Sequence, residues 1–300
     1  MNIGDILIWL DSQNYEYEFS GDKSALVEGF SSLARYKADT ISWVKDEQHY
    51  TKLGRPADIT CAVVQDRVSV DFKNIIRTKK SKELFFAILR NYWGSSSETG
   101  HIGKGTVISE EAIIAPSVSI GCNCTIVGNV QISAYTVIEN NVVIQGNVRI
   151  GRKCHIQSGA VIGIDGYGYS LNTETGKKEM VMHFGGVEIG DEVFIGSHVN
   201  IARGTIDDTV IKSGVKIAPS THIGHNNVIE ENTSLICSNL YGSVQVGQDS
   251  YITASTIENQ VKIGNHTVIG MGSVVTKPIE DNVIAFGIPA KVIRKNDSSL

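Results

Sequence analysis

The sequence lacks the features that would direct a protein to a membrane or to nucleic acid. No stretch approaches the roughly 18 apolar residues of a membrane span, and the start of the chain carries Asp5 but no basic residue, unlike a secretory signal. No long basic run occurs, and the net charge is −5 at pH 7. Electrostatic attraction to nucleic acid or to an anionic membrane is therefore not expected. We expect a cytoplasmic protein with no nucleic-acid partner and no membrane span.

Cysteine is sparse and follows no pattern. The chain has an odd number of cysteines and no CxxC pair among them: Cys61, Cys122, Cys124, Cys154 and Cys237. Neither a disulfide framework nor a zinc motif is predicted by such spacing. We expect reduced thiols that fill space, and no bound metal.

Tryptophan is absent after Trp93, whereas glycines and isoleucines crowd the rest of the chain. The run at 94–100, Gly-Ser-Ser-Ser-Glu-Thr-Gly, is polar and typical of a linker. We therefore predict a small α/β domain over 1–93, a linker over 94–100, a second domain over 101–277 and a C-terminal tail over 278–300. The tail is expected to fray from Val292 onward.

The first domain carries two local signals. Residues 59–70 are predicted as strand and turn, and residues 81–93 as an amphipathic helix with Ser81 as its N-cap. The apolar side chains expected on one face of this helix are Leu84, Phe85, Ile88, Leu89 and Tyr92.

An isoleucine recurs at every sixth position from residue 102 to residue 162. The eleven positions are Ile102, Ile108, Ile114, Ile120, Ile126, Ile132, Ile138, Ile144, Ile150, Ile156 and Ile162. A period of six does not fit the 3.6 residues of an α-helical turn, but it fits a chain that turns a corner every six residues and points one large side chain inward from each side. The second domain is therefore predicted to be a β-helix.

The six-residue period continues with changes of phase. It resumes at Ile189, Ile195 and Ile201, then at Ile211, Ile217, Ile223, Ile229 and Leu235, then at Val246 and Ile252, and finally at Ile263, Ile269 and Val275. Each break is interpreted as an inserted bulge or loop. The largest, 165–186, is too polar and irregular to continue the coil, so we expect it to project outward.

Repeated Ile-Gly pairs add a family resemblance. The pattern [Ile/Val]-Gly-x-x-x-x at residues 120, 150, 189, 195, 223, 263 and 269 resembles the hexapeptide-repeat acyltransferases. Segments 158–169, 203–211, 223–226 and 270–274, with the ending 287–289, look more narrowly like the UDP-3-O-acylglucosamine N-acyltransferases of lipid A synthesis, and 38–44 looks like that family's nucleotide-binding segment. The resemblance implies a mainly β chain, a left-handed parallel β-helix with a small N-terminal α/β nucleotide-binding domain, working as a homotrimer.

The same resemblance implies an activity. It predicts N-acyl transfer from a thioester to the amino group of a nucleotide-linked sugar, which needs a base for the amine and a donor for the oxyanion. His225 matches the family's general base, and Asn226 follows it as a substrate-binding candidate. Counting the period onward from His225 suggests the backbone N–H of Gly242 for the oxyanion. A histidine that merely hydrogen-bonds its neighbours on a β-helix face is the alternative for His225.

Several departures from the family pattern favour a different acceptor. The family's aspartate seven residues before the base is Ala218 here, its second histidine falls at Asn259-Gln260, and its Asp-Arg-Gly is Ala202-Arg203-Gly204. Around the uracil, the family's aromatic, asparagine and tyrosine become Trp43, Asp46 and His49, with Tyr50 one position late. We therefore predict another nucleotide-linked amino sugar, for example a thymidine-linked one. The lipid A precursor, with acyl carrier protein as donor, is the alternative.

Other side chains have two interpretations each. Trp43 is a platform for the nucleotide base or a core tryptophan. Tyr167 and Tyr169 either reach a neighbouring subunit's active site or fasten their own loop. Asp207 and Asp208 either replace the carboxylate absent at Ala218 or satisfy N–H groups of a turn.

The end of the chain bears on the acyl donor. Residues 270–278 and 287–294 resemble the last coil and tail of CoA-dependent sugar acetyltransferases, and the C-terminal helices of the lipid A enzymes are missing. We therefore prefer acyl-CoA over acyl carrier protein, with Lys277, Lys291 and Arg294 as candidate phosphate contacts. Solvated basic residues at the end of a β-helix are the alternative. No tightly bound cofactor is predicted.

Two rival functions remain open. Zinc-dependent carbonic anhydrases are also trimeric left-handed β-helices, and His198, His222 and His225 resemble their histidine set, although the spacing differs and that family has no domain like 1–93. A β-helix that has lost catalysis is the second rival, since Ala218 and Gln260 replace functional residues of the resembled family.

Overall fold

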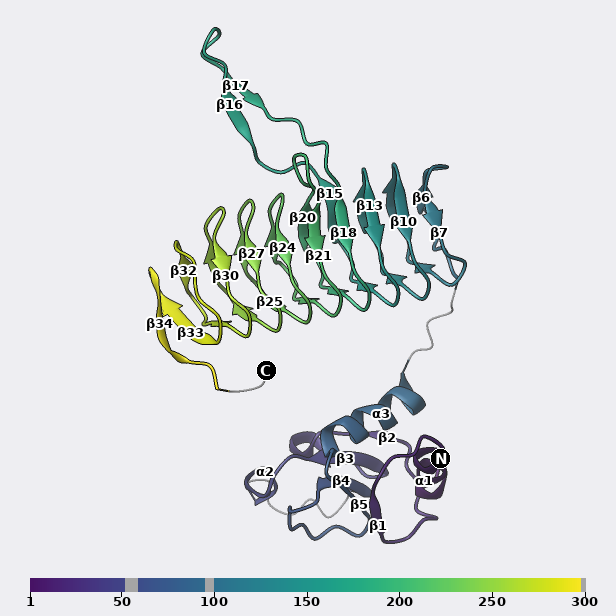
Figure 1. The fold of residues 1–300 in the computed structure, drawn as a ribbon. Coiled ribbons are helices and arrows are strands. Elements are labelled where there is room, and N and C mark those ends of the chain that lie inside the picture. Colours follow the sequence, from purple (N-terminus) through teal and green to yellow (C-terminus); the bar gives the residue numbers. More distant parts are fainter. Residues whose placement is uncertain (52–58, 95–99, 298–300) are drawn as a thin grey trace. The chain divides into compact units, whose positions relative to one another are not determined.

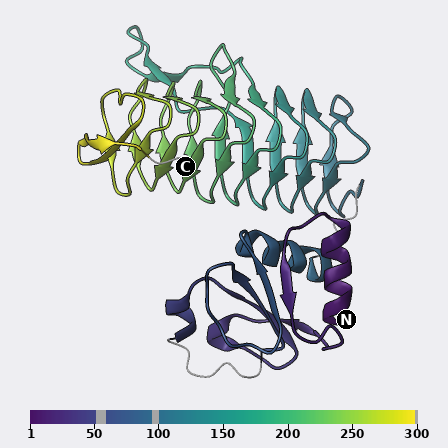
Figure 2. The same ribbon diagram turned by 60° about the horizontal axis from the view of Figure 1, so that its bottom comes forward.

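The chain divides into two compact units, residues 1–96 and 97–300, in a computed structural model that describes residues 1–51, 59–94 and 100–297. Figures 1 and 2 show both units. Most of the predicted linker, 95–99, lies outside the described residues.

The first unit is a five-stranded sheet with helices and loops on both faces. Its elements are α1 (Ile3–Ser12), β1 (Glu18–Ser20), β2 (Gly29–Phe30), the 3₁₀ helix η1 (Leu33–Arg35), β3 (Thr40–Val44), α2 (Glu47–Thr51), β4 (Cys61–Gln65), β5 (Ile75–Thr78) and α3 (Ser81–Trp93). The strand order is β1-β5-β4-β3-β2; β1 pairs with β5 antiparallel, and the other pairs are parallel. Alternate residues of β4 enter two separate apolar clusters, one under α1 and α3 and one on the opposite face.

The predicted helix at 81–93 is present, but its predicted N-cap is wrong. Lys80 occupies the cap position and Ser81 is the first helical residue. The Ser81 hydroxyl accepts a hydrogen bond from Trp43 Nε1 at 3.0 Å and donates one to Gln65 Oε1 at 3.0 Å. Ser81 therefore ties α3 to strands β3 and β4 instead of capping the helix.

The second unit is a β-helix whose coils contribute one strand to each of three parallel sheets. The first sheet contains β7 (Ile113–Ile114), β10 (Val130–Ile132), β13 (Val148–Ile150), β18 (Val187–Ile189), β21 (Thr209–Ile211), β24 (Val228–Ile229), β27 (Gln245–Val246) and β30 (Lys262–Ile263). The second contains β6 (Val107–Ile108), β9 (Thr125–Val127), β12 (Val143–Gln145), β15 (Val161–Ile164), β20 (Asn200–Ala202), β23 (His222–Ile223), β26 (Asn239–Leu240), β29 (Thr256–Ile257) and β32 (Val274–Val275).

The third sheet contains β8 (Ser119–Ile120), β11 (Val137–Ile138), β14 (His155–Ile156), β19 (Phe194–Ile195), β22 (Lys216–Ile217), β25 (Ser234–Ile236), β28 (Tyr251–Thr253), β31 (Val268–Ile269), β33 (Val283–Gly287) and β34 (Ala290–Lys295). The prediction of a left-handed parallel β-helix preceded by a small α/β domain is confirmed.

The six-residue period marks the inward side chains, as predicted. Isoleucines in register stack from coil to coil, as Ile126, Ile144 and Ile162 do, and each of these is fully buried. Burying one such side chain contributes about 1.5–3 kcal/mol. The first isoleucine of the period is not buried in this way, because Ile102 is 54% exposed at the N-terminal end of the described β-helix.

Two breaks in the period are shortened turns, which corrects the expectation that every break is an insertion. Leu240 and Ile257 are fully buried and stand five residues after Leu235 and Ile252, so the period loses one residue at each step. Strand pairing agrees, because Ile223 lies opposite Leu240 and Leu240 lies opposite Ile257. The two coils from Ile223 to Ile257 are therefore each 17 residues long.

The long excursion at 165–186 forms a hairpin. Its strands are β16 (Tyr169–Leu171) and β17 (Lys178–Met180), paired antiparallel. The hairpin projects away from the coils of the β-helix in Figure 1, as predicted for this segment.

The C-terminal tail is ordered up to residue 297, contrary to the expectation that it frays from Val292. Strand β33 pairs with β31, and β34 folds back on β33 with Val292 opposite Ala285, so the tail ends the third sheet as an antiparallel hairpin. The exposed strand edge left by the last coil explains this, since it offers backbone groups for further pairing. Residues 298–300 lie outside the described part of the chain.

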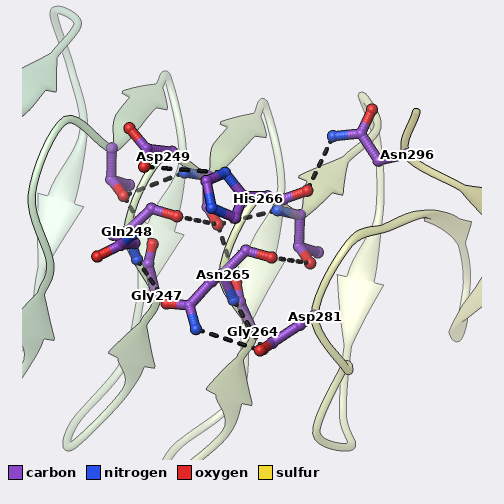
Figure 3. A network of polar contacts seen from close by, with 11 residues as sticks. Gly247, Gln248, Asp249, Gly264, Asn265, His266, Asp281 and Asn296 are labelled. Carbon is purple, nitrogen blue, oxygen red and sulfur yellow. Dashed lines mark hydrogen bonds and ion pairs between the residues drawn. The ribbon is translucent and has the colours of Figure 1, made fainter. Parts of the chain in front are cut away.

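The corners between strands are fastened by side chains that reach back to the preceding coil. In Figure 3, Asn265 Oδ1 accepts the N–H of Gln248 at 3.0 Å, and Asp281 Oδ1 accepts the N–H of Asn265 at 2.9 Å. A Cβ on Gly247 would lie 2.6 Å from the Asn265 nitrogen, which is why glycine occupies this corner. The same type of contact recurs at the candidate site below.

No helix among the residues that the structure describes is long and apolar enough to cross a membrane.

Candidate functional site

His225 lies at the corner between β23 and β24, with its imidazole half-buried. Its Nδ1 is 3.0 Å from Asn226 Oδ1. That oxygen also accepts hydrogen bonds from the N–H and Oγ1 of Thr205, while Asn226 Nδ2 donates to the Asp207 carbonyl. The orientation of the amide is thereby set, so Nδ1 must be the donor. In the neutral ring this leaves Nε2 with a free lone pair, the form that a general base needs.

Gly242 lies directly beneath that free nitrogen. A Cβ on Gly242 would be 2.6 Å from His225 Nε2, so only glycine leaves room for the ring. The N–H of Gly242, predicted to bind the oxyanion, donates to Asn259 Oδ1 at 2.8 Å. This contact is of the same type as the one that Asn265 makes with the N–H of Gln248 in Figure 3. Because the Asn259 side chain is exposed, a ligand could displace it.

A buried histidine that the sequence analysis did not select adjoins His225. The His183 and His225 rings lie 5.4 Å apart, centroid to centroid, at 78°. His183 follows the hairpin and is 1% exposed. No spacing in the sequence brings residue 183 near residue 225; only the return of the hairpin to the β-helix does so. The one available signal was a histidine between two apolar residues, Met182 and Phe184.

The bulge at 203–208 supports the base without supplying a carboxylate to it. Asp208 binds Arg149 at 3.0 Å and accepts the N–H of Gly186 at 2.6 Å. Asp207 contributes its backbone carbonyl to Asn226. In this structure the amide of Asn226, rather than an aspartate on the bulge, takes the position beside His225 Nδ1.

The three predicted base-binding residues of the first unit are not brought together. Trp43 packs on the side of α3, with its ring 6.3 Å from Phe86. Tyr50 packs against the opposite cluster, with its ring 5.3 Å from Phe72. Asp46 lies between them in sequence, and its carbonyl accepts the N–H of Tyr50. The side chain of His49 lies outside the described part.

The two hairpin tyrosines are exposed and contact each other. Tyr167 is 82% exposed and Tyr169 is 47% exposed, and their rings lie 5.1 Å apart. Exposed Leu171, Met182 and Phe184 extend this apolar surface.

The candidate donor-binding residues lie at the C-terminal end of the β-helix. Lys277 follows β32 and is exposed. Strand β32 is the third strand after β23 in the second sheet, so the coil that precedes Lys277 lies about 14 Å along the axis from that of His225. Lys291 and Arg294 are exposed on β34.

The rival zinc interpretation needs three grouped ligands, and only those of a single chain can be compared. No three His, Cys, Asp or Glu side chains are grouped so as to hold a metal ion in residues 1–51, 59–94 and 100–297. His198 is exposed and would touch a Cβ on Gly159. His222 is half-buried on β23, and burial lowers its pKa.

Comparisons with known proteins agree with the resemblance seen in the sequence. Residues 129–163 match the family described as bacterial transferase hexapeptide (six repeats). The UDP-3-O-acylglucosamine N-acyltransferase of Coxiella burnetii (strain Dugway 5J108-111) is 38% identical over 282 residues, 86% of this chain and 82% of that protein. The protein of the same name from Leptothrix cholodnii is 28% identical over 241 residues, 70% of this chain and 67% of that protein.

Two solved structures are also similar. LpxA from Acinetobacter baumannii has a TM-score of 0.57 and 28% identity, covering 64% of this chain and 73% of that one. The UDP-N-acetylglucosamine acyltransferase of Francisella novicida has a TM-score of 0.58 and 26% identity, covering 64% of this chain and 69% of that one.

Proposed function

This chain belongs to the family of UDP-3-O-acylglucosamine N-acyltransferases, and on that basis we propose that it acylates the amino group of UDP-3-O-acylglucosamine in lipid A synthesis. We choose this acceptor because the relatives that match 86% of the chain are named for it. The observation that carries the chemistry is the His225 imidazole, with Nδ1 held by Asn226 and Nε2 free above Gly242.

The chemical steps follow from these positions. His225 Nε2 takes a proton from the acceptor amine as the nitrogen attacks the thioester carbonyl, and a C–N bond forms. The oxyanion that results accepts a hydrogen bond from the N–H of Gly242. Collapse of the intermediate breaks the C–S bond, and the leaving thiolate takes the proton back from His225, which yields an amide and a thiol.

The engagement of Gly242 by Asn259 does not prevent this step. A hydrogen bond between neutral groups contributes about 0.5–1.5 kcal/mol, whereas one to a charged group contributes about 1.5–3 kcal/mol. A negatively charged oxyanion therefore competes successfully with the exposed Asn259 amide for the Gly242 N–H.

The donor is a thioester carried by acyl carrier protein or by CoA. Lys291, Arg294 and Lys295 on β34 flank the exposed pair Val292 and Ile293. A basic and apolar strand of this kind suits an acidic carrier protein, and Lys277 with the same strand suits the phosphates of CoA.

A homotrimer is part of the proposal. The exposed apolar side chains of the hairpin, among them Tyr167, Met182 and Phe184, would be covered by another copy. The molar mass of the purified protein, measured by light scattering, tests this directly. A monomer mass at micromolar concentration would contradict the trimer.

A second acceptor is favoured by one observation. Trp43 and Tyr50 lie on opposite faces of the first unit's sheet, so they do not form a uracil site together. With the departures from the family pattern at Ala218, Asp46 and His49, another nucleotide-linked amino sugar, such as a thymidine-linked one, is the second candidate.

The test is a matrix of two acceptors and two donors. Purified protein is mixed with UDP-3-O-acylglucosamine or a thymidine-linked amino sugar, and with an acylated acyl carrier protein or an acyl-CoA, each over a series of acyl chain lengths. Mass spectrometry then detects a nucleotide sugar heavier by one acyl group. We expect product with UDP-3-O-acylglucosamine. Product with the thymidine sugar alone would select the second acceptor, and no product in any combination would refute N-acyl transfer.

A further inference from the structure

His183 is turned inward between two apolar side chains that are turned outward. Met182 is 67% exposed and Phe184 is 73% exposed, whereas His183 is 1% exposed. This arrangement reverses the usual preference, in which the apolar side chains are buried and the histidine is more accessible. Apolar burial therefore does not explain why His183 points into the molecule.

The hydrogen bonds of His183 define its tautomer. Nδ1 lies 2.9 Å from the Val181 carbonyl, which can only accept, so Nδ1 carries the hydrogen. Nε2 is buried and has no partner among the described residues. A proton on Nε2 would create a buried charge without a partner, which is unfavourable. The neutral ring thus presents a bare lone pair.

The lone pair and His225 face the same small space. A Cβ on Gly166 would lie 3.0 Å from His183 Nε2 and 2.9 Å from His225 Cδ2. Gly166, at the start of the excursion, therefore covers both rings. A buried Nε2 is not accessible to a substrate, so any influence of His183 on the reaction must pass through His225.

One segment of backbone fixes both rings. The N–H of Phe184 donates to the Thr205 carbonyl at 2.7 Å, and the N–H of Gly185 donates to the Gly204 carbonyl at 3.1 Å. The same bulge binds Asn226 through Thr205 and Asp207. The spacing between the two histidines is therefore set by direct contacts to 204–207.

We propose that His183 is a positioning residue for His225, an inference that rests on the proposed function. The His225 ring becomes positively charged when Nε2 takes the amine proton, and the lone pair of His183 Nε2 lies in the same small space beside that ring, under Gly166. Ala218 supplies no carboxylate and Asn226 supplies only a neutral oxygen. His183 provides a second neutral acceptor that orients the ring and stabilises its protonated form.

Other ionisable groups lie on the elements that pack against the pair: Asp165, Arg203, Asp207, Asp208, His222 and Tyr241. Asp165 binds Arg203 at 3.0 Å, and Asp208 binds Arg149 at 3.0 Å. In each of these ion pairs the two charges offset each other. Because the pairs are the same in the wild type and in variants at residue 183, their effect on the titration of His225 does not change between them.

The test compares pH profiles of kcat/KM for His183→Phe, which keeps a ring without a lone pair, and His183→Gln, which keeps a neutral acceptor. We expect His183→Phe to move the acid limb down by about half a pH unit and to lower kcat about 5-fold, with little change in KM. His183→Gln should return the limb towards its wild-type position. Exposed His101 gives the matched control, and His101→Phe should change neither quantity.

An NMR titration of the His225 ring supplies a readout that needs no substrate. A lowered midpoint of the His225 titration in His183→Phe, with the midpoint of His183→Gln close to that of wild type, supports the proposal. This holds even if no acyl transfer is found, because the lack of transfer would refute only the proposed function. Normal transfer with an unshifted midpoint in His183→Phe would overturn the proposal and leave the function standing. If His183→Phe does not fold, His183→Leu takes its place with the same expected shift.

Discussion

The close approach of Gly242 to His225 predicts a specific loss of turnover in Gly242→Ala. The new Cβ would lie 2.6 Å from Nε2 and 2.7 Å from Cε1, whereas ordinary contact begins at 3.4 Å. The ring must therefore withdraw by about 0.8 Å, the difference between 2.6 and 3.4 Å. Since a misplacement of about 1 Å can slow a reaction about 100-fold, we expect kcat to fall about 30- to 100-fold. That loss corresponds to about 2–2.7 kcal/mol in the barrier.

Stability should hardly change in the same variant. Gly242 is not among the residues with positive φ, so alanine is compatible with its backbone and lowers the entropy of the unfolded chain. Steady-state kinetics and thermal unfolding are measured together. Gly29→Ala is the matched control, because its Cβ would meet only Thr40 Cγ2 within 4 Å, at 3.9 Å, which is ordinary contact. Wild-type kcat in Gly242→Ala would refute the placement of the reactive nitrogen above Gly242.

Three further outcomes are expected. Asn259→Ala frees the Gly242 N–H, so kcat should rise by up to about 5-fold, the equivalent of about 1 kcal/mol; a fall of 10-fold or more would identify the Asn259 amide itself as a donor. Burial raises the pKa of Glu139, but hydrogen bonds from His155 and Ser158 more than offset this and lower it overall. Its carboxylate therefore adds stability that is present above its unfolded pKa and is lost as pH falls through the lower folded value. The gap in melting temperature between wild type and Glu139→Gln should accordingly close on acidification from pH 6 to pH 3, and a gap independent of pH would contradict the attribution. Reversing the charge of Lys291 and Arg294 together should raise the KM for the acyl donor several-fold at low salt and less at high salt, and an unchanged KM would exclude β34 from donor binding.

The inward-facing core could be predicted from the sequence because the β-helix repeats one local rule. Each coil places a large β-branched side chain at equivalent positions. The six-residue spacing therefore predicts that Ile126 and Ile144 stack on each other, as they do. Five-residue steps such as Leu235 to Leu240 could be misread as insertions, since only the pairing of Ile223 with Leu240 shows which residue is inward.

The site could be predicted only where it coincided with a local motif. His225 and Gly242 are adjacent in space because coils stack at a regular spacing, which the sequence period contains. His183 could not be found in this way, because the hairpin that returns it to the β-helix has no period. The capture of the Gly242 N–H by Asn259 depends on a side-chain rotamer at an exposed corner, and no residue pattern specifies that.

The most direct test of the central claim is the rate of N-acyl transfer to UDP-3-O-acylglucosamine by wild type and by His225→Ala, measured by product mass under saturating donor. Folding of the variant is first verified by an unchanged melting temperature. A base that removes the amine proton contributes about 100- to 10,000-fold, so we expect a loss of that size in kcat with little change in KM. Transfer by His225→Ala within 3-fold of wild type would contradict the account.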